Sequence, residues 1–364
     1  MAISDDGMIS SESVGFGSQI GDSLKGILIG IVLFPLSFYG IFKVETCNQA
    51  SDAFKKAKPV SQREEGKPVY VTGKLDAEPI SSDFVKSGKY ISVSQSSEVY
   101  AWDEESRTEG TGSNKKTIKE CKLEWTSNPD DPSKFSLPGC KEKKWHQRKV
   151  KTENTTAKQG KLSADGKSYF VNLSEVDFAS SVQTRNASNE ELIANGFSIA
   201  GDYLYSDPQC QSTPQEGCER VSIRVTPIPE SEMTFFGDLS GDKITKYIYD
   251  GDQFLNAGIG NYQQVMANIK QDDATKLWIG RGICFLMMWA SFVLMAGPLM
   301  TLLEFIPFVG ELGKGVLNFV FGLIAFVLTA ITVILVKFWY IWLLLILAAI
   351  GYAIYKRKFA PKTA

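Results

Sequence analysis

Few of the side chains that carry out catalysis occur in this chain in a usable arrangement. His146 is the only histidine among 364 residues, which leaves serine, cysteine and metal hydrolase sites almost no material. The sequence contains no Walker loop, no GxSxG elbow and no GxGxxG turn after a strand. We therefore expect no enzyme, no catalytic or cofactor-binding residues, no cofactor and no metal site.

The cysteines offer a different chemistry. Cys121 and Cys140 flank a loop rich in Pro and Asp, and Cys210 and Cys218 flank a second short loop. Short-range pairs in loops are typical of disulfides that form in an oxidising compartment. A metal site is the alternative interpretation, but the chain has no CxxC spacing and a single histidine. The spacing therefore predicts two disulfides.

A further group of candidates lies in residues 297–315, where acids and helix-breaking residues interrupt an apolar stretch. These candidates are Pro298, Glu304, Pro307, Gly310 and Glu311. Acids at membrane depth are candidates for function, and irregular backbone there must be covered by protein or lie at the interface. The alternative is that both acids lie in the headgroup layer, where a helix ends.

Long uncharged runs surround this stretch. Residues 282–303, 315–336 and 338–355 follow one another, and residues 26–42 form a fourth run near the N-terminus. A hydrocarbon core about 30 Å thick needs about 20 apolar residues in a helix, so each of the three later runs can cross it, whereas the shorter run 26–42 needs flanking side chains that reach the interface. The sequence therefore predicts an integral membrane protein with four transmembrane helices.

The first run is the shortest and could also be the core of a signal peptide. The residues before it carry acids, including Asp5, Asp6 and Glu12, where a signal peptide needs positive charge, so we favour a retained helix. Gly26 and Gly30 lie on one face of that helix, where another helix could pack closely. A chance pair of glycines is the alternative.

Four spans divide the chain into segments on two sides of the membrane. We expect a cytoplasmic tail (1–25), transmembrane helix 1 (26–42), a lumenal or periplasmic domain (44–280), transmembrane helix 2 (282–303), an interfacial linker (304–314), transmembrane helices 3 and 4 (315–336 and 338–355) and a basic cytoplasmic tail (356–364). The basic tail favours cytoplasmic termini, although lysines near both ends of residues 44–280 weaken this rule. The predicted disulfides place residues 44–280 in an oxidising compartment.

Residues 44–280 alternate like β-strands between helical ends. The predicted strands are 69–75, 90–102, 118–125, 169–173 and 220–228. Residues 252–280 have helical spacing, and Ser188 with Glu191 forms a capping box that predicts a short helix. We thus expect an α+β membrane protein whose large β-rich (α+β) domain is inserted between transmembrane helices 1 and 2.

Two segments of this domain lack a clear strand pattern. Residues 104–116 have no hydrophobic period and are predicted to form a loop. The basic run 141–151 could bind nucleic acid or anionic lipid, but the net charge of −2 and the non-cytoplasmic position favour a solvated segment. We expect no nucleic-acid partner.

Several motifs are shared with a known family. Gly-Pro-Leu at 297–299 and Ile-Pro-Phe-Val-Gly at 306–310 precede a long apolar run, and Glu98-Val-Tyr-Ala-Trp102 and Leu123-Glu-Trp125 form aromatic strands. With the first span and the approach to the second, this pattern resembles the transmembrane protein 43 (LUMA) family over essentially the whole chain. The chain lacks the family's Asn-Glu-Gly-Arg and Gly-His-x-Asn-Pro motifs, of which only Glu45 and His146 carry over.

The resemblance implies four spans, termini in the cytoplasm or nucleoplasm, and a large lumenal domain. It also implies the endoplasmic reticulum and inner nuclear membrane in an animal host, or the inner membrane with a periplasmic domain in a bacterium. We expect a non-enzymatic multi-pass scaffold that organises membrane protein complexes through oligomerised spans and an outer protein-binding domain. Its partners would be the lipid membrane, other membrane proteins and further copies of itself. The alternative is a channel or transporter subunit with Glu304 and Glu311 near the pathway.

Overall fold

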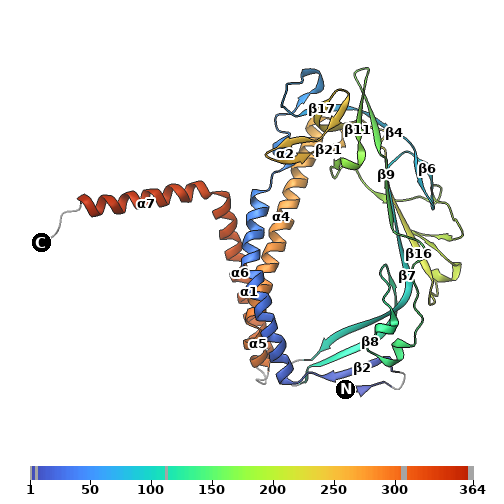
Figure 1. Ribbon diagram of the computed structural model, residues 1–364, viewed down its shortest axis with the longest axis vertical. Helices are drawn as coiled ribbons and strands as arrows, with labels where there is room; N and C mark the ends of the chain where they lie inside the picture. The colour runs from blue at the N-terminus through green and yellow to red at the C-terminus, as the bar shows by residue number, and fades with distance from the viewer. Residues whose placement is uncertain (1, 5–6, 111–113, 305–309, 360–364) are drawn as a thin grey trace. The chain divides into compact units, whose positions relative to one another are not determined.

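The computed structural model describes residues 2–4, 7–110, 114–304 and 310–359 (Figure 1). The chain divides into two compact units. The first, called here the strand unit, comprises Met1–Ser13, Asn48–Glu109 and Lys116–Asp273. The second, called the helical unit, comprises Val14–Cys47, Gly110–Lys115 and Ala274–Ala364.

An eight-stranded sheet forms one core of the strand unit. Its central strands are β4 (Val69–Ala77), β10 (Gln159–Ala164), β11 (Lys167–Asn172), β18 (Lys243–Thr245) and β17 (Met233–Ser240). They close on themselves, because β17 pairs with β18 on one side and with β4 on the other. Closure leaves these strands without a free edge and encloses buried side chains such as Val71, Leu162 and Phe235.

Three short strands extend this sheet. They are β3 (Lys58–Pro59), which pairs with β4, and β21 (Asn256–Ile259) and β12 (Asp177–Phe178), which follow β17. Two separate hairpins are formed by β5 (Ile80–Ser82) with β6 (Val85–Gly88) and by β19 (Tyr247–Tyr249) with β20 (Asp252–Phe254). The short helices of the unit include α2 (Ala50–Ala53) and α3 (Pro138–Lys141).

A nine-stranded sheet forms the rest of the strand unit. Its strands, in spatial order, are β1 (Ala2–Ile3), β2 (Ile9–Ser13), β8 (Lys116–Thr126), β7 (Tyr90–Glu109), β16 (Glu219–Pro227), β15 (Tyr203–Tyr205) and β14 (Ser198–Ala200), with β9 (Glu153–Thr156) on β7 and β13 (Arg185–Asn186) on β16. In β16, Val221, Ile223 and Val225 are buried in alternation with more exposed polar neighbours, as the sequence predicted.

The long strand β7 is buried only over its first part. From residue 103 onward its burial falls, and residues 105–109 are exposed. This part of β7 pairs with residues 116–122 of β8, and we call the two segments the β7–β8 arm. The arm corrects the loop predicted for residues 104–116, because cross-strand pairs of opposite charge such as Lys122 with Glu105 stabilise strands that have no hydrophobic period.

The N-terminal residues also differ from the tail that their composition predicts. Residues Ile9–Ser13 form strand β2, which pairs antiparallel with β8, and helix α1 already begins at Phe16. The pairing satisfies the free backbone groups at the edge of β8, and the hydrogen bond from Cys121 N to Met8 O (2.9 Å) continues it. A polar strand can pair in this way because the backbone, and not the side chains, supplies the bonds.

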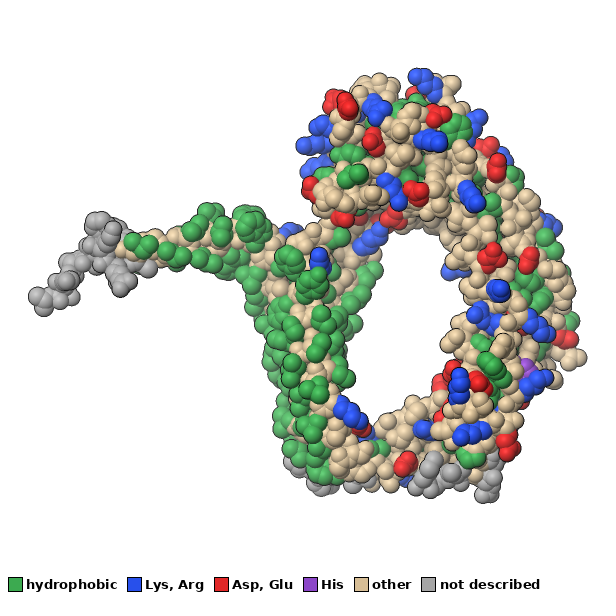
Figure 2. Space-filling view, in the orientation of Figure 1, with side chains coloured by type: hydrophobic (Ala, Val, Ile, Leu, Met, Phe, Trp, Pro, Cys, Tyr) green, Lys and Arg blue, Asp and Glu red, His purple; other side chains and the backbone are tan. Residues whose placement is uncertain are grey.

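In the part of the chain that the structure describes, the helical unit contains five helices of eight residues or more. They are α1 (Phe16–Thr46), the part of α4 (Tyr262–Met295) from Ala274 onward, α5 (Gly297–Glu304), α6 (Gly310–Lys337) and α7 (Trp339–Phe359). Among the described residues, three helices (α1, α4 and α6) are long and apolar enough to cross a membrane. The apolar part of α7, Trp339–Tyr352, is shorter. Figure 2 shows hydrophobic side chains along the visible face of α6 and of the part of α7 that is not drawn in grey.

Two helix boundaries differ from the expected ones. Residues 282–303 are not one helix, because α4 ends at Met295 and α5 begins at Gly297. The ring of Pro298 would clash with the carbonyl group four residues earlier, which interrupts a continuous helix at this point. The helix expected from residue 252 starts only at Tyr262, after β20 and β21, and Asn261 caps it by accepting a bond from Gln264 N (3.1 Å).

Candidate functional site

An ion pair joins the first two membrane helices of the helical unit. Arg281 Nε donates to Glu45 Oε1 (2.6 Å), and Arg281 Nη2 donates to Glu45 Oε2 (2.9 Å). The Glu45 side chain is 4% exposed, and that of Arg281 is 15% exposed. The guanidinium also lies over the Trp278 ring, 5.0 Å from its centroid. Glu45 therefore holds α1 to α4 beside the predicted first span.

Small residues allow α1 and α4 to approach each other closely. A Cβ atom at Gly26 would lie 3.4 Å from Leu294 Cδ2, and one at Gly30 would lie 2.8 Å from Met295 Cγ. Farther along α1, a Cβ atom at Gly40 would lie 2.8 Å from the Cys284 thiol. The structure thus places a second helix against the face that carries Gly26 and Gly30.

The linker candidates are described only in part. Pro298 lies in the first turn of α5, and Thr301, three residues on, lies 2.7 Å from Ser23 Oγ of α1. Glu304 ends α5, and Gly310 and Glu311 begin α6. The side chains of Glu304 and Glu311, and Pro307 as a whole, lie outside what the structure describes. A pathway lined by these acids therefore stays a prediction.

The first cysteine pair closes a loop at the base of the β7–β8 arm. Cys121 of β8 is joined to Cys140 of α3, and both pack in a small buried cluster with Phe135 and Leu137. Glu104 of β7 fixes the same loop by accepting bonds from Ser136 N (2.6 Å) and Leu137 N (2.9 Å). Although burial opposes the charged form, these bonds hold the pKa of Glu104 below its usual value.

The second cysteine pair, Cys210 with Cys218, lies beside the only histidine. Gly217 has a φ of +80° and leaves no room for a side chain, because a Cβ atom there would lie 2.6 Å from His146 Nδ1. His146 Nε2 lies 3.6 Å from a carboxylate oxygen of Glu216, whose other oxygen accepts a bond from the Trp102 indole (2.7 Å). His146 thus takes part in a local polar cluster around the disulfide loop.

The basic run 141–151 is held against the nine-stranded sheet. Glu219 of β16, which is 2% exposed, accepts bonds from Lys149 N (3.0 Å) and Val150 N (2.8 Å). Ser97 of β7 donates to the carbonyl of Val150 (2.5 Å), and Arg148 donates to Ser97 Oγ (3.1 Å). The backbone of the run is therefore fixed to the sheet. The buried Glu219 carboxylate contributes by accepting hydrogen bonds from two amide groups of the run.

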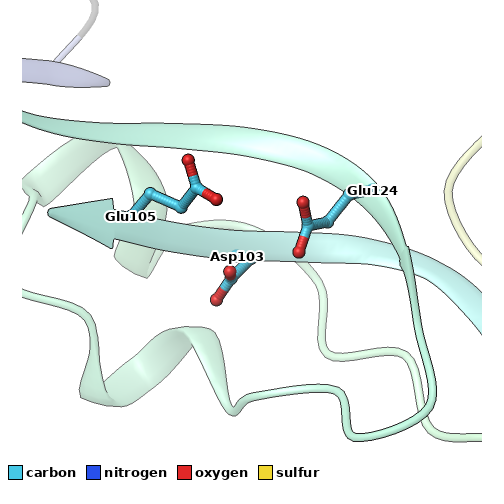
Figure 3. Close-up of side chains that lie close together, drawn as sticks. All are labelled: Asp103, Glu105 and Glu124. Atoms are coloured by element: carbon cyan, nitrogen blue, oxygen red, sulfur yellow. The ribbon is translucent and has the colours of Figure 1, made fainter. Parts of the chain in front are cut away.

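Three carboxylates gather on one face of the paired strands β7 and β8, at the start of the β7–β8 arm (Figure 3). One oxygen each from Asp103, Glu105 and Glu124 lies within 4.8 Å of the others. Burial, and then the charge of Glu124, raises the pKa of Asp103. The ammonium group of Lys122 lies 2.6 Å from Glu105 and 2.9 Å from Glu124. Oxygen ligands of this kind suit a hard cation such as Ca²⁺, but Lys122 already balances part of their charge.

Sequence reasoning missed this carboxylate cluster. Asp103 and Glu105 alternate on one strand, and Glu124 comes from the next strand, two residues beyond the partner of Asp103. Only the register of β7 against β8 brings the three together, and register cannot be read from one strand alone. The alternation of acids in 103–105 was the one signal that could have suggested a shared face.

The capping box at Ser188 and Glu191 forms a turn rather than a helix. Glu191 accepts two bonds from Arg185 (2.7 and 2.8 Å) and one from Ser188 N (2.7 Å). Tyr90 also donates its hydroxyl proton to Glu191 (3.2 Å). The bonds, led by that from Arg185, lower the pKa of Glu191 to about 2. These tertiary partners compete successfully with a helix that would begin at Ser188.

Comparisons with known proteins agree with the pattern of membrane helices. The family model described as Transmembrane protein 43 matches residues 99–342, which is more than half of the chain. The matched residues include α4, α5 and α6 and all of the β7–β8 pairing. No curated protein and no solved structure matches the chain.

Proposed function

The chain belongs to the transmembrane protein 43 family, and on that premise we propose that it is a non-enzymatic membrane scaffold. Its spans associate with other copies, and its strand unit binds other membrane proteins. The observation that carries this proposal is the β7–β8 arm, whose charged side chains of both signs are exposed at 105–109 of β7 and mostly half-buried in β8. An arm that adds little to the core serves to present a surface to a partner.

Reversing the charge of acidic residues on the β7–β8 arm tests this proposal. Glu105→Lys together with Glu109→Lys should weaken the capture of partners from native membranes after chemical cross-linking. The matched control is Glu78→Lys with Asp165→Lys, which changes the same charge elsewhere in the strand unit. Recovery of the bare monomer from the unaltered protein, or equal capture by both variants, would remove the scaffold proposal.

Self-association is supported by one face of α6. Phe319, Leu323 and Phe326 follow one another at helical spacing and are 72%, 56% and 63% exposed. A large apolar stripe of this kind packs against lipid or against another helix. Cysteine at position 319 should form a disulfide-linked dimer in membranes if the stripe joins two copies, whereas cysteine at Leu286 of α4 is the control.

We propose that the strand unit from Asn48 onward lies in the lumen or periplasm and that the basic C-terminal tail lies in the cytoplasm, with α7 as the fourth span. The two disulfides support the first placement, because thiols stay reduced in the cytoplasm. Helix α1 packs along α4, so the two helices cross together. The residues before α1 then lie on the cytoplasmic side.

This topology sets a condition on strand β2. Charged strands such as β8 cannot pass through hydrocarbon, so β2 pairs with β8 only where no bilayer separates them. Cysteines at Ser11 and Ile118, which are Cα partners in the sheet, should cross-link in detergent and fail to cross-link in sealed membranes. A cross-link of equal yield in sealed membranes would contradict a crossing α1.

A further inference from the structure

A groove in the helical unit is formed by the C-terminal ends of α1 and α6 and by the first residue of α7. It has a volume of about 480 Å³ and is lined by Phe42, Thr46, Leu335, Val336 and Trp339. Phe42 and Thr46 lie four residues apart on α1, so one face of that helix forms one wall. Leu335 and Val336 form the opposite wall.

The surface of this groove is apolar. Thr46, its one polar residue, donates its hydroxyl proton to the carbonyl of Phe42 (2.8 Å), so its bonding needs are met within α1. Phe42, Leu335 and Trp339 remain 50%, 40% and 64% exposed. Apolar surface of this extent at the end of membrane helices matches the hydrocarbon chain of a lipid, which offers no polar group to bind.

In the sequence, a lysine comes directly after each wall, just outside the residues that line the groove. Lys43 comes directly after Phe42 on α1, and Lys337 comes directly after Val336 at the end of α6. Both side chains are exposed, and the Lys43 ammonium lies 5.7 Å from the centroid of the Tyr39 ring. Long lysine side chains at the ends of spans reach the headgroup layer, where their ammonium groups attract anionic phosphates.

From this arrangement we propose that the groove binds an anionic phospholipid. One acyl chain lies in the groove between Phe42 of α1 and Leu335 of α6, and the phosphate lies between Lys43 and Lys337. Trp339, at the mouth, occupies the interfacial level that tryptophan prefers. The charge complementarity distinguishes this lipid from neutral phosphatidylcholine, and the proposal needs only that α1 and α6 lie in a membrane, whatever partners the strand unit binds.

Contact quenching of Trp339 tests the proposal. The full chain is reconstituted in phosphatidylcholine vesicles that contain phosphatidylglycerol, and one of the two lipids carries brominated acyl chains. The signal of Trp339 is the difference between the protein and its Trp339→Phe variant. We expect brominated phosphatidylglycerol to compete about fivefold better than brominated phosphatidylcholine for contact with Trp339.

A double variant tests whether the two lysines, and not the apolar groove, cause the preference for the anionic lipid. Lys43→Gln combined with Lys337→Gln should abolish the preference, so that both brominated lipids quench Trp339 equally. Lys25→Gln, at the other end of α1, should leave the preference unchanged. Added inorganic phosphate should not displace the lipid, because the chain in the groove holds it. Equal quenching by both lipids in the unaltered protein, or a preference that survives the double variant, would overturn the proposal.

Discussion

The strand unit and the helical unit each contain a glutamate that accepts two bonds from one arginine. In the strand unit Arg185 binds Glu191, with side chains 47% and 19% exposed. In the helical unit Arg281 binds Glu45, with side chains 15% and 4% exposed. Both pairs have two hydrogen bonds, although Arg185 donates through Nη1 and Nη2 and Arg281 through Nε and Nη2, and the two pairs differ in how deeply they are buried.

The two carboxylates differ in how much each depends on its arginine. Glu191 also accepts bonds from Ser188 and from Tyr90. Among the described residues, Glu45 takes its side-chain hydrogen bonds from Arg281. A buried ion pair without further partners adds little net stability when intact, but leaving one member unpaired is strongly unfavourable. The comparison predicts that the helical unit is the more sensitive to loss of its glutamate.

Removal of Glu45 should have the largest effect. Glu45→Ala leaves the Arg281 guanidinium buried with a charge that has lost its partner, which should lower the free energy of unfolding by about 3–5 kcal/mol. The measurement is reversible unfolding in mixed detergent micelles. Glu45→Ala combined with Arg281→Met is the control and should recover most of the loss. An unchanged single variant would mean that burial does not distinguish the two pairs.

Removal of Glu191 should have the next largest effect, and it should depend on pH. The folded pKa of about 2 lies below the ordinary value of 4.5, so the stabilisation is present above about pH 4.5 and is lost as the pH falls toward 2. A shift of this size corresponds to about 3 kcal/mol at most. Denaturant unfolding across this range measures it. Glu191→Gln should already be less stable at neutral pH and should lose less on acidification; an identical pH profile would contradict the assignment.

The close contact of α1 with α4 gives a third, smaller effect. Gly30→Ala introduces a methyl group 2.8 Å from Met295 Cγ and from Ser291 O, and it should destabilise the helical unit by about 1–3 kcal/mol. Gly21→Ala, on the same helix with no atom within 4 Å, is the matched control and should not destabilise. Equal unfolding of the two variants would show that α4 does not pack at Gly30, and the Glu45 pair would then stand alone as the link.

An exposed ion pair should contribute least to stability in this comparison. Lys89 binds Asp76 at 2.7 Å, but the two side chains are 64% and 57% exposed. Water screens such a pair, so Asp76→Asn should leave the unfolding midpoint of the strand unit unchanged. A clear decrease would mean that geometry, and not burial, sets the value of these ion pairs.

Local patterns predicted much of the secondary structure. All five predicted strands occur, as β4, β7, β8, β11 and β16, and both cysteine pairs are joined as disulfides. These features depend on residues that lie near one another in the chain. At Ser188 the predicted helix is absent, because the nearby Arg185 and the distant Tyr90 both bind Glu191 and hold the segment in a turn.

The candidate sites were predicted less well than the fold. Glu45 could be named only from a family motif, and its partner lies 236 positions away in the chain. The carboxylate cluster needed the register of β7 against β8, and the lipid groove needed the ends of α1, α6 and α7 together. Local sequence patterns cannot predict these contacts, because each contact forms when elements that are far apart in the chain pack together.

The sequence by itself determined that this is an integral membrane protein with a β-rich unit. Long uncharged runs and strand alternation can be read directly from the order of the residues. They imply that the runs lie in a bilayer and that one face of each strand lies in a core, whatever the tertiary arrangement. Only the tertiary structure decided the closure of β17 onto β4, the Glu45–Arg281 pair and the groove beside Lys43 and Lys337. Those features join residues far apart in the chain, and they exist only once the elements have packed.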